Sequence, residues 1–150
     1  MKQRGLNSGA FGDDLYSLIQ QWKQPNGPFS EIVTEVFGYV SQHYGSIKSV
    51  TEIASSLGQN YHTLRNRFRR EARMTLEELL ARVRVVHALE LILETDLLIK
   101  EIAWEVGYRY EDQLARAMKK WLGFTPQIVR RQHLLTRSIS RGLSRARRLV

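Results

Sequence analysis

The chain contains an internal repeat, and this repeat constrains its fold more than any other feature of the sequence. The string EIA at residues 52–54, followed by LG at 57–58, returns 49 positions later as EIA at 101–103, followed by VG at 106–107. Self-similarity at a fixed period indicates copies of one supersecondary unit. We therefore expect two structural units of the same kind, one on each side of a connecting segment.

Each copy has the sequence form of a helix-turn-helix. A short apolar helix is followed by a glycine and then by a second helix whose apolar residues recur at i and i+4. Two hairpins packed for stability alone would also repeat, but two matched copies with basic outer faces favour a binding role. After one extra residue in the second turn, the matched positions are Leu64 with Leu114, Phe68 with Met118, Arg69 and Arg70 with Lys119 and Lys120, and Thr75 with Thr125.

The helical periodicity predicts an all-α fold of about seven helices, in which two helix-turn-helix subdomains are joined by a long linker helix. A linker helix of about 20 residues would span roughly 30 Å. Ser30 is expected to cap a first core helix, and the segments 49–52 and 75–78 have the form of capping boxes. The predicted segments are an extension or linker at 1–28 with a short helix at 13–22, a domain at 29–133, a first helix-turn-helix at about 50–71, the linker helix at about 75–94, a second helix-turn-helix at about 99–122 and a basic tail at 134–150.

The positive charge is concentrated toward the C-terminus. The formal net charge is +8, yet residues 1–112 contain 13 Lys and Arg against 15 Asp and Glu, whereas residues 113–150 contain 10 Lys and Arg and no acid. Such a surface favours polyanions, with nucleic acid first and an acidic membrane second. Since no stretch approaches the roughly 18 apolar residues of a membrane span, we expect no membrane contact and a cytoplasmic, nucleoid-associated protein.

Several classes of chemistry are excluded by the residues that the chain lacks. There is no cysteine for a disulfide, a thiolate metal site or a nucleophile, and the four histidines show no pair at i, i+4. No glycine-rich phosphate loop or Ser/His/Asp arrangement can be assembled. We therefore expect no enzyme activity, no cofactor, no metal and no small-molecule ligand. Trp104 and Trp121 lie within helical patterns and are expected to pack rather than to stack on bases.

Opposite its apolar positions, the second helix of each copy presents a polar stripe. Arg can bond guanine with two hydrogen bonds, Asn can do the same with adenine, and cations further along the helix suit phosphate. An ordinary solvated helix face is the alternative, and it is strongest at His62 and Asp112. The candidates for base contact are His62, Arg65, Asn66, Glu111, Asp112 and Arg116, and the candidates for phosphate contact are Arg69, Arg70, Lys119, Lys120, Arg130 and Arg131.

The two acids of the second copy leave alternatives open. Glu111 and Asp112 stand at the start of the helix that would approach a major groove, where acids repel phosphate. They could accept hydrogen bonds from cytosine N4, and Asp112 could instead cap its helix or pair with Arg116 one turn on. We prefer the interpretation that the second unit docks less specifically than the first and mainly anchors.

The chain contains an ordered set of short motifs. They are Ile53-Ala54-x-x-Leu57-Gly58, Leu64-x-x-x-Phe68-x-x-Glu71, Arg84-x-x-x-Ala88, Ile99-x-x-Ile102-Ala103-x-x-x-Gly107-Tyr108, Arg116-x-x-Lys119 and Gly123-Phe124-Thr125-Pro126. Taken in order, these motifs resemble the DNA-binding domain of the AraC/XylS family of bacterial transcription regulators, over about residues 29–131. The resemblance implies two recognition helices that enter successive major grooves on one face of the DNA, with base-facing residues at His62, Arg65, Asn66, Glu111, Asp112, Ala115 and Arg116.

The chain also departs from the family pattern. Tyr108 stands where Phe is usual, Leu114 and Met118 replace Phe residues, and Arg73 replaces a usual Gly, which bears on local turn geometry only. Residues 1–28 are too short for the N-terminal effector or dimerisation domain that many members carry. We therefore expect either a stand-alone member or a portion of a longer regulator. A stand-alone member would bind DNA as a monomer.

The C-terminal tail has three competing interpretations. It contains Arg137, Arg141, Arg145, Arg147 and Arg148 and no acid, and Ile139, Leu143 and Ala146 recur at helical spacing around Gly142. Added phosphate contacts are preferred, a disordered solvated tail comes second, and docking to a membrane or a protein comes third.

The expected function is a sequence-specific transcription activator or repressor that binds double-stranded DNA, with RNA polymerase as a further candidate partner. The alternative is a protein-binding adaptor that keeps the helix-turn-helix fold but has lost specific DNA reading.

Overall fold

The structure is a computed structural model that describes the backbone of residues 27–148 and the side chains of residues 27–137. The expected helix at 13–22 and nearly all of the 1–28 segment therefore lie outside the described residues. The described part is all-α, as predicted. Its seven helices are α2 (Glu31–His43), α3 (Thr51–Ser56), α4 (Tyr61–Ala72), α5 (Leu76–Glu94), α6 (Ile99–Glu105), α7 (Glu111–Leu122) and α8 (Pro126–Arg148).

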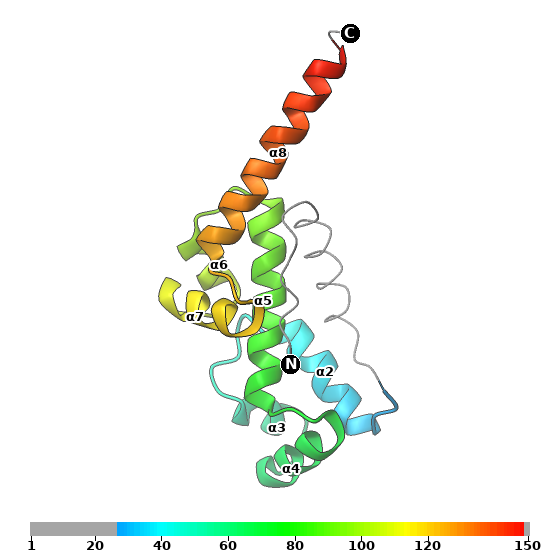
Figure 1. Cartoon of the computed structure of the whole chain (residues 1–150). Helices are drawn as coiled ribbons and strands as arrows, with labels where there is room; N and C mark the ends of the chain where they lie inside the picture. Colours follow the sequence, from blue (N-terminus) through cyan, green and yellow to red (C-terminus); the bar gives the residue numbers. More distant parts are fainter. Residues whose placement is uncertain (1–26, 149–150) are drawn as a thin grey trace.

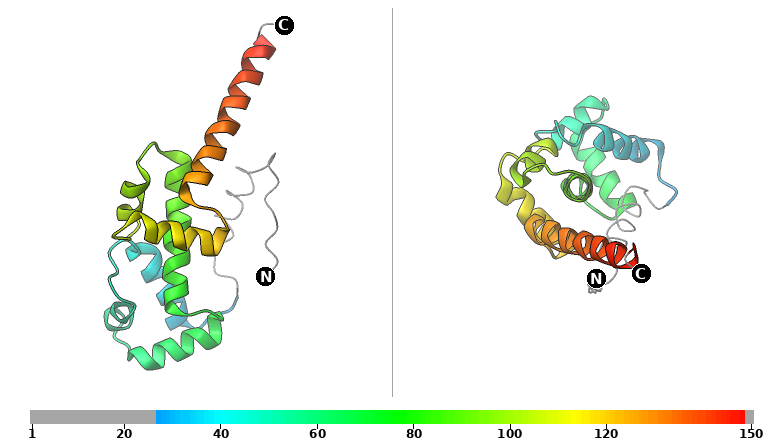
Figure 2. Two further views of the ribbon diagram at one scale, coloured as in Figure 1. Left: turned by 60° about the vertical axis from the view of Figure 1, so that its left-hand side comes forward. Right: turned by 90° about the horizontal axis from the view of Figure 1, so that it is seen from above.

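The long helix α5 stands at the centre, and the other helices pack around it (Figure 1). Its first half joins α2, α3 and α4 in one hydrophobic core, to which it contributes Leu76, Leu79 and Leu80. Its second half, from Val85 to Leu93, joins α6, α7 and the start of α8 in another core. Seen from above, α5 is enclosed by the other helices, which is why its apolar residues are spread around its circumference (Figure 2).

The internal repeat of the sequence is reproduced in the hydrogen bonds of the two turns. In the first turn the backbone N–H groups of Leu57, Gly58 and Gln59 donate to the carbonyls of Ile53, Ser55 and Ala54. In the second turn those of Val106, Gly107 and Tyr108 donate to Ile102, Trp104 and Ala103. Gly58 and Gly107 have φ angles of 65° and 102°, which favour glycine in both copies. The two predicted helix-turn-helix units are confirmed.

The predicted helix starts are confirmed at Thr75 and wrong at Ser49. The Thr75 hydroxyl accepts from the Glu78 N–H at 3.1 Å, and the Glu78 carboxylate accepts from the Thr75 N–H at 3.3 Å, which completes a capping box. At the start of α3 the Glu52 N–H instead donates to the backbone carbonyl of Ser49, because Val50 is already in helical conformation (φ −63°, ψ −19°).

Ser30 occupies the predicted N-cap position of α2, but its hydroxyl binds elsewhere. Both its hydroxyl (2.8 Å) and its backbone N–H (3.0 Å) donate to the Glu71 carboxylate near the end of α4. These two hydrogen bonds hold the pKa of Glu71 below its ordinary value, and the backbone N–H contributes more than the hydroxyl. Nearby arginines make a smaller contribution in the same direction. The contact joins the start of α2 to the end of the second helix of the first unit.

The residue after α4 shows the effect of the Arg73 departure from the family pattern. Arg73 adopts a left-handed conformation, with φ 59° and ψ 27°, and its N–H donates to the Arg69 carbonyl. Gly123 ends α7 in the same way: its φ angle is 81°, and its N–H donates to the Lys119 carbonyl. The turn geometry is therefore the same in both copies, and in the first copy a side chain is forced into a conformation that suits glycine.

Helix α8 is longer than the sequence pattern indicated. Its backbone stays helical from Pro126 through Gly142 to Arg148, with no break at the predicted boundary between 133 and 134. The first turns pack against the body, where Val129 is buried in the second core. The remainder projects beyond the end of α5 (Figure 1).

We predict that Arg73→Gly stabilises the protein by about 0.5–1 kcal/mol, because glycine adopts this left-handed conformation without strain. Chemical denaturation would measure the change, with Gly123→Ala as the converse control, which should lose a similar amount. Equal or lower stability of Arg73→Gly would contradict the assigned backbone strain.

Glu71 should give the protein a component of acid sensitivity. Because its folded pKa is lowered, its contribution is full above the unfolded value of about 4.3 and is lost as the pH falls through the folded pKa. We expect Glu71→Gln to be less stable at neutral pH and to lose less stability than the wild type below about pH 4.3. Thermal unfolding across this range tests it, with the exposed Glu35→Gln as the control. A wild-type pH profile in Glu71→Gln would refute the assignment.

Candidate nucleic-acid interface

Helix α4 presents its predicted polar stripe to solvent. The side chains of Leu64 and Phe68 are buried in the first core and fix the rotation of the helix. Its start is capped by the Asn60 side chain, which accepts from the Thr63 N–H at 3.1 Å. The opposite face is therefore turned outward, and its exposed residues are His62, Arg65, Asn66, Arg69 and Arg70.

The polar groups of this face are available for an external partner. Within residues 27–137, the side chains of Arg65, Asn66 and Arg69 have no hydrogen-bond or ion-pair partner, and His62 only packs edge-on against the Tyr61 ring at 5.5 Å. The one arginine of α4 with an ion pair among the described residues is Arg67, whose guanidinium lies 3.4 Å from the Glu71 carboxylate. A cationic face without internal acceptors is suited to bind an anion or a row of hydrogen-bond acceptors.

Helix α7 is anchored in the same way but its outer face is different. Leu114 and Met118 are fully buried in the second core. Asp112 and Arg116 form an ion pair at 3.2 Å, and both side chains remain about three-quarters exposed. Asp112 does not cap the helix, because Tyr110 occupies the N-cap position. Of the alternatives left open for Asp112, the structure therefore contains the pair with Arg116.

Two further polar groups of α7 also have partners within the molecule. The Glu111 carboxylate accepts from the Gln127 side chain of α8 at 2.7 Å. The Lys119 ammonium donates to the Gly123 carbonyl at 3.2 Å and so closes its own helix end. The predicted surface of the second unit is thus largely engaged, whereas that of the first unit is free.

The last turn of α7 packs against the linker helix through Trp121. The guanidinium of Arg82 lies over the indole at 4.6 Å, and the ammonium of Lys120 lies 5.3 Å from the same ring. Trp121 therefore packs, as predicted, and holds the end of α7 to α5. Lys120 remains exposed.

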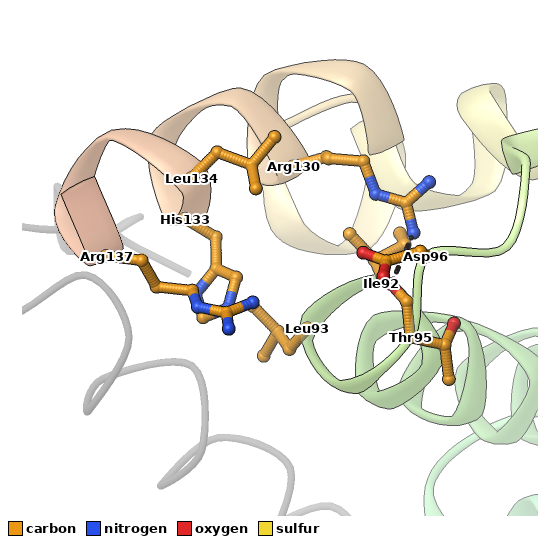
Figure 3. A pocket seen from close by; sticks show the side chains of 8 residues that line it. All are labelled: Ile92, Leu93, Thr95, Asp96, Arg130, His133, Leu134 and Arg137. Carbon is orange, nitrogen blue, oxygen red and sulfur yellow. Dashed lines mark hydrogen bonds between the residues drawn. The ribbon is translucent and has the colours of Figure 1, made fainter.

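Of the two arginines predicted on α8, Arg130 supports the fold and Arg131 is exposed. The Arg130 guanidinium donates to the carbonyls of Leu97 and Thr95 in the loop between α5 and α6. It lies beside a small cavity that is also lined by Asp96, His133 and Arg137 (Figure 3). A phosphate contact at Arg130 would have to use its remaining N–H groups.

The end of α6 and the turn before α7 contain exposed groups whose position the sequence pattern did not indicate. Trp104 is 62% exposed, so the expectation that it packs is wrong. Its indole N–H donates to the Arg109 carbonyl at 3.0 Å, and the Arg109 guanidinium lies 5.7 Å from the Tyr110 ring. Arg109 is a further exposed cation, and its position in the turn before α7 was the only signal for it in the sequence.

Other kinds of site are not found in the described part of the chain. No group of three His, Asp or Glu side chains there could hold a metal ion. Among the described helices, none combines the length and the apolar character that crossing a membrane requires.

The comparisons agree with this geometry. A family model described as a helix-turn-helix domain matches residues 49–132, which is more than half of the chain. The C-terminal domain of AraT, a response regulator from Geobacillus stearothermophilus, is 31% identical with a TM-score of 0.66, over 70% of this chain and 88% of that one. The DNA-binding domain of AdpA, solved with a target DNA, has a TM-score of 0.67 and 24% identity, over 73% and 98%.

Similar full-length regulators are longer than this chain. The melibiose operon regulatory protein of Escherichia coli (strain K12) is 23% identical over 66% of this chain and 33% of its own length. The Msm operon regulatory protein of Streptococcus mutans serotype c is 26% identical over 79% of this chain and 44% of its own length. The chain thus spans less than half of either relative. The matched family is one of DNA-binding regulators rather than enzymes. The chain belongs to the AraC family of helix-turn-helix transcription regulators.

Proposed function

We propose that this protein is a sequence-specific transcription regulator that inserts α4 and α7 into adjacent major grooves of one DNA duplex. The observation that carries the proposal is the pair of exposed polar helices, each fixed by a buried apolar face, in two units that share one linker helix. The 19 residues of α5 span about 28 Å, which is close to the roughly 34 Å repeat of a DNA turn.

The free side chains of α4 are suited to read bases. Arg65 can donate two hydrogen bonds to O6 and N7 of guanine, and Asn66 can pair with the N6 and N7 positions of adenine. His62 lies nearest the start of the helix, where recognition helices approach base edges. Arg69 and Arg70 follow in the last turns, where they are suited to phosphates.

Helix α7 is proposed to contribute mainly affinity. Its guanidinium at Arg116 is shared with Asp112, and its Glu111 is held by Gln127. An internal partner already satisfies part of the hydrogen-bonding capacity of Arg116 and Glu111, which leaves fewer groups for base edges than on α4. Arg116 remains a candidate for base contact, with Lys119, Lys120, Arg131 and Arg109 as candidates for phosphate contact.

We infer that the protein acts in the cytoplasm on the nucleoid, binds its site as a monomer because it carries two reading helices, and touches RNA polymerase through a face away from the DNA. The AdpA domain, whose fold this chain shares, was solved on its target DNA, which supports duplex DNA as the partner.

Selection from a random duplex pool tests the proposal. We expect a two-part motif with stronger base preferences in the half bound by α4. Equal discrimination in both halves would contradict the unequal roles, and recovery of no motif would favour the adaptor alternative, in which the fold is kept without specific DNA reading.

Arg65→Ala should cost about 1–3 kcal/mol on the selected site and relax one position of the first half-site. Arg67→Ala is the matched control, because it removes an exposed arginine of the same helix that is already paired with Glu71. Equilibrium binding to the selected site and to its single-base variants gives both quantities. Equal losses for the two variants would remove Arg65 from the base contacts.

The end of α8 is proposed to add phosphate contacts. Deleting residues 138–150 removes four arginines and no acid. Binding should weaken about equally for every sequence, and the slope of log K against log salt should become shallower by up to about 3.6. The undeleted chain with Arg141→Gln, Arg145→Gln, Arg147→Gln and Arg148→Gln should behave like the deletion. An unchanged slope would exclude phosphate contacts by this segment.

A further inference from the structure

The two helix-turn-helix units meet at a close contact beside the linker helix. The segment after α2, in the first unit, lies against the turn between α6 and α7, in the second. Tyr44 packs against both hydrophobic cores and stacks on His87 of α5, with ring centroids 4.0 Å apart and an angle of 5°. A single side chain thus belongs to both units.

Two glycines allow the backbones of the units to approach this closely. A Cβ atom added at Gly45 would lie 2.9 Å from the carbonyl oxygen of Glu105. A Cβ atom added at Gly107 would lie 2.8 Å from the carbonyl oxygen of Tyr44 and 2.9 Å from the Arg84 guanidinium. Any side chain at either position would have to move one unit away from the other.

Arg84 of α5 contacts residues of both units at this point. Its Nε donates to the Tyr44 carbonyl at 2.9 Å, and its Nη2 donates to the Ile47 carbonyl at 2.6 Å. Its guanidinium also lies 5.2 Å from the Tyr108 ring in the second unit. Because the planar fork makes directional bonds to two carbonyls, lysine cannot replace it. We call Tyr44, Gly45, Arg84, Gly107 and Tyr108 the junction.

We propose that the junction fixes the separation and relative orientation of the two recognition helices, and that Arg84, Gly45 and Gly107 thereby set the half-site spacing that the protein accepts. The second part rests on the proposed function. These are positioning residues, since none lies on the exposed faces of α4 or α7. The junction therefore distinguishes DNA sites by the distance between their half-sites and not by their base sequence.

The chain offers matched controls for each glycine. Gly45 does not have a left-handed φ, so Gly45→Ala tests the contact alone. Gly38→Ala, in α2, adds the same methyl group where nothing lies within 4 Å. Gly58→Ala is the control for Gly107→Ala, because Gly58 occupies the equivalent turn with φ +65° and has open space around it.

The first test measures the free protein. Since the chain has no cysteine, spin labels can be attached at Ser55→Cys in α3 and Lys100→Cys in α6, both exposed and outside the proposed DNA surfaces. Double electron–electron resonance should give one narrow distance distribution for the wild type and for Gly38→Ala. Gly45→Ala and the milder Arg84→Lys should shift or broaden it. A wild-type distribution in both would overturn the proposal whether or not DNA is bound.

The second test measures the consequence on the selected two-part site. One inserted base pair moves the second half-site by about 3.4 Å and should weaken wild-type binding roughly tenfold or more. For Gly45→Ala and Arg84→Lys this spacing penalty should fall below about threefold, while binding to an isolated first half-site stays at the wild-type value. An undiminished spacing penalty in both variants would refute the role in spacing. A failure to select any site would contradict the proposed function and leave the distance result standing.

Discussion

The structure depends on one constraint: helix α5 belongs to two hydrophobic cores at once. Its first turns bury Leu76, Leu79 and Leu80 with the first unit, and the stretch from Val85 to Leu93 is buried with the second. A helix that is apolar on all sides is stable only when it is covered on all sides. Neither unit can therefore leave α5 without exposing apolar surface, and α4 and α7 are both held to one helix.

The two units have matching core positions but different outer surfaces. The buried positions repeat closely, as Leu64 and Phe68 in one copy and Leu114 and Met118 in the other, because the same helix pair must be packed twice. The exposed positions do not take part in this packing, so their residues can differ between the two copies. Arg65 and Asn66 are free on α4, whereas Arg116 is paired with Asp112 on α7. The duplicated fold therefore permits the two outer faces to differ, as the proposed function requires.

Sequence patterns predicted what is local or periodic. Helix positions, buried faces, the Thr75 cap and the i, i+4 alternative for Asp112 all follow from spacing along one helix. Ser49 failed as a cap because Val50 had already entered the helical conformation. Trp104 was wrongly predicted to pack, because a helical pattern does not show which side of a short helix other elements cover.

Contacts between distant residues were beyond these patterns. The Arg84 hydrogen bonds join positions 40 and 37 residues apart, and the Glu111 to Gln127 contact joins two helices across a turn. Arg84 was visible in the sequence only as part of a family motif. Its role follows from the approach of two backbones at glycines, which depends on the tertiary fold.

The most direct test of two-groove binding is methylation interference at guanine N7, which lies in the major groove. The structure predicts two clusters of interfering guanines on one face of the duplex, centred about 10 base pairs apart. A single cluster, or weak interference spread along the site, would contradict the insertion of both α4 and α7.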